Sequence, residues 1–269
     1  MRTGRLETRG AKIGRCGICG VRSALTEDHI PPKGATRLKQ AEMMYIIQAL
    51  GAESPAKSQR FTQDGVKFRT LCATCNNDRL GTFLDPDLIK LCNETHANIS
   101  SRIALPRTFT CEVRPQRVAR AVVGHVLGFG LNRVPSGPFE EALAAYFLDF
   151  SAPMPREAEL FYWIYPYNDQ VLVRDAMWMD TRVKGPPGVI FKLLKFHPFA
   201  FLLTWERHSA YNFGFRNLGQ FRSYGIDDYA PLIVDRELLA KRRWPEAPVV
   251  DSSVTFYGRD AMVAQPRRN

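Results

Sequence analysis

The sequence lacks any long apolar run. Its most hydrophobic stretch, residues 189–205, is interrupted by Lys192, Lys195, His197 and Pro198. A helix that spans a bilayer needs ~20 consecutive, mainly apolar residues, so we expect no membrane-spanning segment. The N-terminus is basic and polar, without an apolar segment of the signal-peptide type. These absences predict a cytoplasmic protein that has no membrane partner.

Acidic residues are scarce relative to basic ones. The chain has 37 Lys and Arg against 27 Asp and Glu, which gives a formal net charge of +10. This balance favours a polyanionic partner, and nucleic acid is the commonest one. The excess is clustered in residues 1–15, at 241–243 and at 267–268. A solvated basic surface explains each cluster equally well when it is taken alone.

Internal repeats and low-complexity tracts are also absent. At 269 residues and 45% hydrophobic content, the chain can form one large domain or two ordinary ones with a sizeable core. All recognisable chemistry lies in the first part. We therefore expect a basic arm over residues 1–15, a domain over 16–105, and an α+β domain of unknown role over 106–269.

Cysteine is sparse, but four of the six cysteines are paired by spacing. Cys16 and Cys19 are separated by two residues, as are Cys72 and Cys75. Thiolates at this spacing can bind one soft metal ion together. Four of them close a tetrahedral zinc site with no open position, so the zinc would be structural. The alternative is two unrelated pairs of thiols. The other two cysteines have no such spacing and are expected to be buried thiols.

An acid–histidine dipeptide lies between the cysteine pairs. Asp28 and His29 precede the Pro31–Pro32 step, and Asn76 and Asn77 follow the last cysteine. A carboxylate can bind a hard divalent ion, and a neutral imidazole can take a proton from water. Adjacent side chains on a strand point to opposite faces, so a bulge or turn is needed to bring both to one site. An ordinary hydrogen-bonded histidine is the alternative.

Together these features resemble the HNH endonuclease superfamily. The resemblance lies in the Cys16/Cys19 pair, in Asp28-His29-Ile30-Pro31, and in Leu71-Cys72-Ala73-Thr74-Cys75-Asn76-Asn77, and it covers roughly residues 13–85. It implies a zinc-stapled ββα-metal finger, followed by a larger α+β domain with an antiparallel sheet. It also implies a metal-dependent endonuclease that hydrolyses nucleic-acid phosphodiester bonds.

The resemblance assigns roles to individual residues. His29 would be the general base, and Asp28 and Asn76 would bind a single catalytic Mg²⁺ or Mn²⁺, with Asn77 as a rival for Asn76. The chain departs from compact family members in an insertion at residues 37–63. The asparagine that often orients the histidine in that family is not identifiable between the two motifs.

The expected partner is nucleic acid, with double-stranded DNA favoured over RNA and a homodimer left open. The basic residues expected to contact it are Arg9, Lys12, Arg15, Lys33 and Arg79. Two other functions compete with this one. The first is a non-catalytic zinc-binding module for nucleic acid or protein, and the second is a zinc-containing enzyme that acts on a small phosphorylated molecule.

Periodicity predicts the remaining elements. Helices are expected at 37–50, 117–131 and 139–150, with one more opening at Asn76 or Asn77, and strands at 66–71, 160–165, 171–173, 189–194, 199–205 and 254–257. The other four histidines lack ligand spacing and are expected to be structural or exposed. They are His96, His125, His197 and His208.

Overall fold

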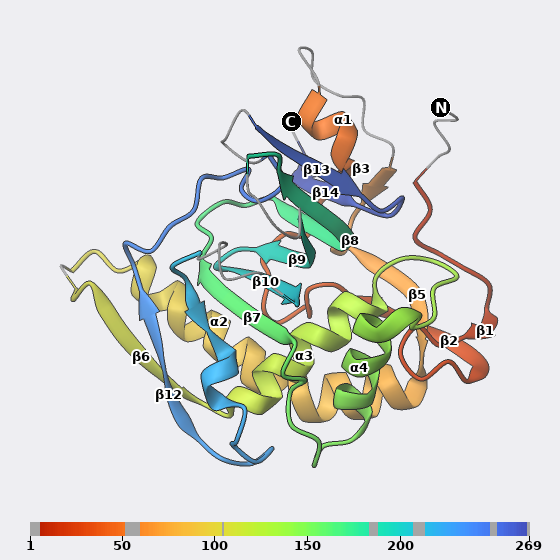
Figure 1. Cartoon of the computed structure of the whole chain (residues 1–269), viewed down its shortest axis with the longest axis horizontal. Coiled ribbons are helices and arrows are strands. Elements are labelled where there is room, and N and C mark those ends of the chain that lie inside the picture. Colours follow the sequence, from red (N-terminus) through yellow and green to blue (C-terminus); the bar gives the residue numbers. More distant parts are fainter. Residues whose placement is uncertain are drawn as a thin grey trace.

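The computed structural model describes residues 6–51, 60–103, 105–182, 188–206, 213–247 and 252–267. The protein is a mixed α+β structure in which the paired strands run antiparallel (Figure 1). It contains a nine-stranded, a three-stranded and a two-stranded sheet. Within the described ranges, none of the helices combines the length and apolarity that crossing a membrane requires.

The three-stranded sheet carries the cysteines. Its order is β1-β2-β5, and the strands are β1 (Ile13–Arg15), β2 (Arg22–His29) and β5 (Lys67–Cys72). A π-helix, η1 (Thr74–Leu84), follows β5 directly and continues into α2 (Asp85–Ile99). The local order is therefore strand, strand, helix, with residues 30–66 inserted between the paired strands.

The nine-stranded sheet forms the centre of the molecule (Figure 1). Its order is β11-β7-β10-β9-β8-β14-β3-β4, with β13 also paired to β8. Its strands are β3 (Ala41–Tyr45), β4 (Arg60–Thr62), β7 (Ala158–Ile164), β8 (Gln170–Asp180), β9 (Gly188–Phe196), β10 (Phe199–Trp205), β11 (Arg216–Asn217), β13 (Ser253–Tyr257) and β14 (Met262–Pro266). The two-stranded sheet pairs β6 (Thr108–Val113) with β12 (Ala230–Asp235).

Helix α3 connects the sheets. Two helices beside it are α4 (Gly137–Leu148) and the short 3-10 helix η2 (Leu218–Phe221), whereas α1 (Ile46–Gly51) packs on β3 and β14. α3 (Pro115–Gly128) packs against β8 and β9, and also against α2, α4 and η1. Gly124 permits this, because a Cβ there would lie 2.5 Å from Phe147 and 2.7 Å from Leu80. The side chains of α3 are buried around nearly the whole circumference of the helix, as expected for a helix enclosed by other elements.

Most of the expected elements are present. The helices expected at 117–131 and 139–150 are α3 and α4, and the six expected strands are β5, β7, β8, β9, β10 and β13. The helix expected over 37–50 is wrong in its first half, where β3 forms a strand. β3 pairs with β14 on one side and β4 on the other, so sheet hydrogen bonding overrides the helical spacing of its apolar residues.

The hydrophobic core extends over both expected domains. Leu71 and Leu80 belong to the same buried cluster as Val122, Phe147 and Phe201. Strands β3 and β4, from the first part of the chain, complete the sheet formed by the second part. The described part of the basic arm is also packed, since Leu6 and Thr8 are buried.

Candidate metal centre and candidate active site

The four paired cysteines gather at one end of the three-stranded sheet. Cys16 and Cys19 lie in the turn between β1 and β2, and Cys72 and Cys75 lie where β5 passes into η1. The β2–β5 pairing brings the two turns together. At this turn, Gly20 adopts a φ of +71°, a conformation that favours glycine, and its backbone N–H donates to the Cys16 carbonyl at 3.0 Å.

The sulfur positions fit a zinc ion. All four Sγ atoms lie within 4.8 Å of one another, and those of Cys19 and Cys72 are 3.8 Å apart. A tetrahedron with Zn–S bonds of ~2.3 Å has edges of ~3.8 Å. The Cys75 N–H donates to Cys72 Sγ at 3.4 Å, and hydrogen bonding from Cys75 lowers the pKa of the Cys16 thiol to about 4. The cluster can therefore hold zinc, as the cysteine spacing predicts.

Asp28 and His29 end β2 and face different surroundings. Asp28 is 4% exposed, and its Oδ2 lies 3.2 Å from Nδ1 of His125 on α3. The opposite nitrogen of His125, Nε2, lies 2.9 Å from Oδ1 of Asp85 on α2. Burial alone would lower the pKa of His125, but the two carboxylates raise it to about 10. Burial also raises the pKa of Asp28, against the effect of the His125 charge. His125 joins β2, α2 and α3 as the cation between the two carboxyl groups.

His29 lies on the more open side of the strand. Its side chain is 26% exposed, and its Nε2 lies 3.6 Å from Oδ2 of Asp64. This nitrogen atom is itself shielded from solvent, and among the described residues it has no hydrogen-bond partner. Lys33 and Lys67 pair with the same Asp64. Burial, with the nearby Lys67 charge, lowers the pKa of His29 despite the opposing effect of Asp64. The imidazole is therefore neutral at pH 7 and can accept a proton.

The two asparagines differ in environment. Asn76 is buried, and its Nδ2 donates to Thr26 Oγ1 at 2.8 Å and to the Glu27 carbonyl at 3.1 Å. It thereby fastens η1 to β2 one residue before Asp28. Asn77 is exposed. The Asp28 carboxylate and the Asn76 amide group therefore have separate hydrogen-bond partners.

Among the described side chains, Asp28 and Asn76 are not arranged to bind a hard divalent ion together, since each is bonded to other groups. Within the described ranges, the four cysteines are the only group of three or more His, Cys, Asp or Glu side chains placed to hold one ion. Asp28 faces the interior, where an imidazolium already fills the cationic position beside it. The cysteine side chains are thus placed to bind zinc, whereas Asp28 is not placed to bind a catalytic divalent ion.

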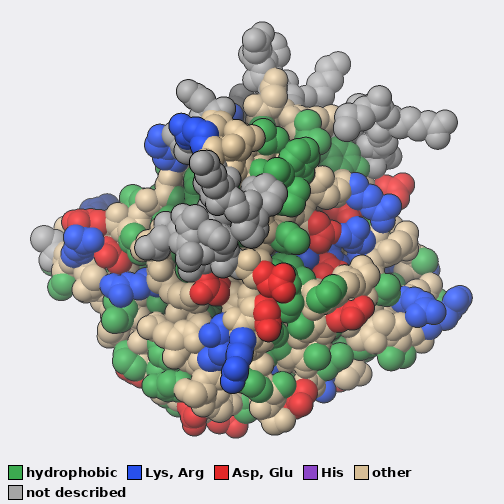
Figure 2. All heavy atoms as spheres, in the orientation of Figure 1, with side chains coloured by type: hydrophobic (Ala, Val, Ile, Leu, Met, Phe, Trp, Pro, Cys, Tyr) green, Lys and Arg blue, Asp and Glu red, His purple; other side chains and the backbone are tan. Residues whose placement is uncertain are grey.

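The basic residues expected to contact nucleic acid differ in their surroundings, since some are exposed and others are bonded to protein groups. Lys12 and Arg15 are exposed on and beside β1. Arg9 pairs with Glu27 at 2.8 Å. Arg79 donates to the Leu148 carbonyl at 2.8 Å and so packs against the end of α4. On the face shown in Figure 2, Lys and Arg lie in several separate places, with acidic side chains between them.

A cavity of about 380 Å³ adjoins the surroundings of His29. It is lined by Arg9, Arg60, Asp64 and Lys67, among others. Two of these residues also shift the pKa of His29, since Lys67 lowers it and Asp64 raises it. Three cations against one acid make this hollow a suitable place for a phosphate group.

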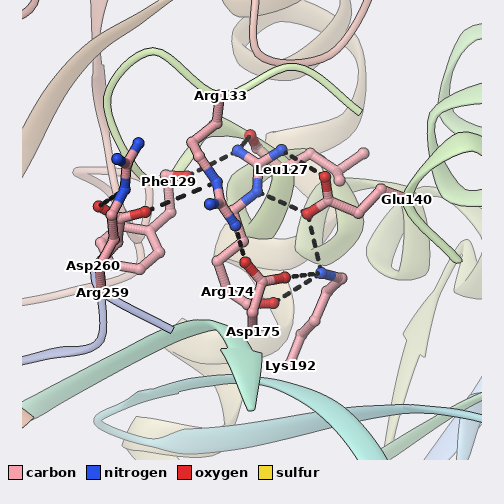
Figure 3. A network of polar contacts seen from close by, with 9 residues as sticks. All are labelled: Leu127, Phe129, Arg133, Glu140, Arg174, Asp175, Lys192, Arg259 and Asp260. Atoms are coloured by element: carbon pink, nitrogen blue, oxygen red, sulfur yellow. Dashed lines mark hydrogen bonds and ion pairs between the residues drawn. The ribbon is translucent and has the colours of Figure 1, made fainter. Parts of the chain in front are cut away.

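A buried ion network is the feature that sequence patterns did not predict (Figure 3). Arg174 of β8 forms a two-point pair with Glu140 of α4, at 2.7 and 3.1 Å. It also donates to the Leu127 and Phe129 carbonyls at the end of α3. Lys192 of β9 bonds to Glu140 at 3.0 Å. The only available signal was a charged residue inside each of two apolar strands.

Comparison with protein-family models, with curated proteins and with solved structures gave no match.

Proposed function

We propose that the protein is a metal-dependent endonuclease of the HNH type, which hydrolyses phosphodiester bonds of nucleic acid with His29 as general base. One observation carries this proposal. The His29 Nε2 is a buried nitrogen without a hydrogen-bond partner within the described ranges, and it lies at the end of a strand held by the four-cysteine cluster. The strand, strand, helix order of β2, β5 and η1 supports the ββα finger that the sequence resembles.

The chemistry assigned to His29 follows from its surroundings. Its lowered pKa keeps the imidazole neutral, so that Nε2 can take a proton from a water molecule that attacks phosphorus. Lys33 and Lys67 lie within reach of the same Asp64 and supply positive charge for the phosphate oxygens. The zinc would have no part in the reaction. It would hold the turn before β2 against the start of η1.

The catalytic divalent ion is supported by the resemblance and not by the side-chain positions. Asp28, with Asn76 or Asn77, would hold a Mg²⁺ or Mn²⁺ ion, which stabilises charge on the leaving oxygen in such enzymes. In this structure the Asp28 carboxylate bonds to His125, and Asn76 bonds to β2. We therefore derive no step through this ion.

The test is the conversion of supercoiled plasmid to nicked or linear DNA, with Mg²⁺ and with Mn²⁺. Wild-type protein is expected to cut, and His29→Ala to cut ~10²–10⁴-fold more slowly. Both proteins should contain equal zinc, which separates loss of the base from loss of the fold. Undiminished cutting by His29→Ala would remove His29 from the mechanism.

One observation favours a second function, namely a non-catalytic zinc-binding module for nucleic acid or protein. The Asp28 carboxylate is buried against His125, and so it serves the fold as it stands. This function predicts binding that survives Asp28→Asn and His29→Ala together, with no cutting by wild-type protein in either ion.

A further inference from the structure

A second cavity is lined by a part of the inserted segment different from the part beside His29. It has a volume of about 480 Å³ and is bordered by residues 36–40, by His96 of α2, and by His197 in the turn between β9 and β10. Sites for small ligands commonly measure about 300–1,000 Å³. The cavity is therefore large enough for a ligand of nucleotide size.

The charge of this cavity is of one sign. Arg37 and Lys39 line it and are exposed, and none of its lining residues is acidic. His96 and His197 share a hydrogen bond of 2.7 Å between Nδ1 and Nε2. Burial and the Arg37 charge lower the pKa of His96, so the positive charge resides on Arg37 and Lys39. The ligand that fits best is an anion.

A buried carbonyl oxygen on Gln170 indicates which kind of anion the cavity binds. Gln170 lines the cavity and is 1% exposed, and its Nε2 donates to Thr36 Oγ1 at 2.9 Å. Its Oε1 is buried without a hydrogen-bond partner among the residues described. Buried acceptors nearly always have a donor. The phosphate group of a monoester dianion offers none, so the donor must come from another part of the ligand. A nucleotide carries hydroxyl and base N–H groups beside its phosphate.

We propose that this cavity binds one nucleotide unit, with its phosphate on Arg37 and Lys39 and a ribose hydroxyl or base N–H donating to Gln170 Oε1. The nucleotide comes either from a nucleic-acid strand or from the free pool.

The backbone links this cavity to His29. The Gly65 N–H donates to the Lys39 carbonyl at 2.8 Å, and a Cβ at Gly65 would lie 3.5 Å from Cδ2 of His29. The segment that lines the cavity is thus hydrogen-bonded to the segment that borders His29, and a single strand that contacts both places is the link to be tested. This link rests on the proposed function, whereas the nucleotide site does not.

The experiment measures binding and requires no cutting. Full-length His29→Ala protein is titrated with adenosine 5′-monophosphate and, separately, with a short DNA duplex, and the histidine ring ¹⁵N signals are followed by NMR. Replacing Arg37 and Lys39 by Ala is expected to weaken binding about tenfold or more, since charge-assisted hydrogen bonds to phosphate are lost. Arg156→Ala is the matched control, because Arg156 is exposed in the turn before β7, outside the cavity.

Each outcome separates the two proposals. Duplex and mononucleotide binding that both depend on Arg37 and Lys39, with shifted His96 and His197 signals, support the site and its link to His29. Mononucleotide binding alone supports the site and contradicts the link. Binding of both ligands that is unaffected by the double variant, or no binding of either, overturns the site. Gln170→Leu provides a second check, and weaker mononucleotide binding at unchanged zinc content is expected.

Discussion

The cysteine cluster and the ion network of Figure 3 meet at the same end of α3. Gly17, between the first two cysteines, is close enough that a Cβ there would lie 3.0 Å from the Leu127 carbonyl oxygen. Arg174 donates to that same carbonyl. Two residues earlier on the helix, His125 contacts Asp28. Two different polar clusters therefore fix the helix that borders the candidate site.

These clusters differ in what they require. The thiolates depend on a metal ion for their favourable arrangement. The ion network depends only on its own charges, because Arg174 and Lys192 neutralise Glu140 within the protein interior. The comparison predicts that metal removal and charge removal weaken the same helix end by separate routes.

The largest effect is expected from Cys72→Ser, which removes one of the four thiolates. A structural zinc site contributes folding free energy directly, so we expect loss of zinc and a destabilisation on the order of 5 kcal/mol or more. Urea unfolding and zinc analysis measure the two quantities. Cys111→Ser is the control, since Cys111 is buried outside the cluster. A Cys72→Ser protein with full zinc content would show that the cluster is not the metal site.

Glu140→Gln should have the next largest effect on stability. The change leaves the buried Arg174 and Lys192 without their shared counter-ion, and breaking buried pairs in this way typically costs about 3–5 kcal/mol. Glu141→Gln is a matched control on the exposed side of α4, with an expected change within about 0.5 kcal/mol. Equal unfolding free energies for the two variants would contradict the role of the network.

The unfolding free energies of wild-type protein and Glu140→Gln should depend differently on pH in the acid range. Although burial raises the pKa of Glu140, Arg174 and Lys192 lower it to about 2 in the folded protein. An unfolded glutamate titrates near pH ~4.3. The stabilisation from Glu140 is therefore present above that pH and is lost as the pH falls toward about 2. The unfolding free energy of Glu140→Gln should change less over this interval.

Asp28→Asn tests whether the Asp28 carboxylate stabilises the fold through its contact with His125. His125 would lose one of its two carboxylate partners, and a loss of about 1–3 kcal/mol in unfolding free energy is expected. His29→Ala should change stability within about 0.5 kcal/mol, because its Nε2 has no hydrogen-bond partner in the described part of the chain. If Asp28→Asn proved as stable as wild type, the contact with His125 would have no structural role.

The smallest expected effect is a shift in the pH dependence of cutting. Burial and Lys67 lower the pKa of His29, so its base form persists to lower pH than in a free histidine. The acid side of the rate profile should therefore fall below pH ~6.5. Lys67→Ala should move it upward, since one cation is removed and Asp64 loses a partner. Initial nicking rates across pH measure the shift, and a midpoint at or above the ordinary value would contradict it.

The sequence predicted what depends on short spacing. The two cysteine pairs were visible because each pair is set by one turn, and most strands and helices followed from apolar periodicity. β3 was missed because β14, the strand that joins it to the main part of the sheet, lies more than 200 residues later in the chain. His125 carried no signal of its charge, since both of its carboxylates lie on other elements.

The central claim is that four thiolates bind one zinc ion and so fix β2 against β5 and η1. X-ray absorption at the zinc edge, on protein purified without added metal, tests this most directly. The account predicts one zinc per chain surrounded by four sulfur atoms at ~2.3 Å. Nitrogen or oxygen ligands in place of sulfur, or folded protein without zinc, would contradict it.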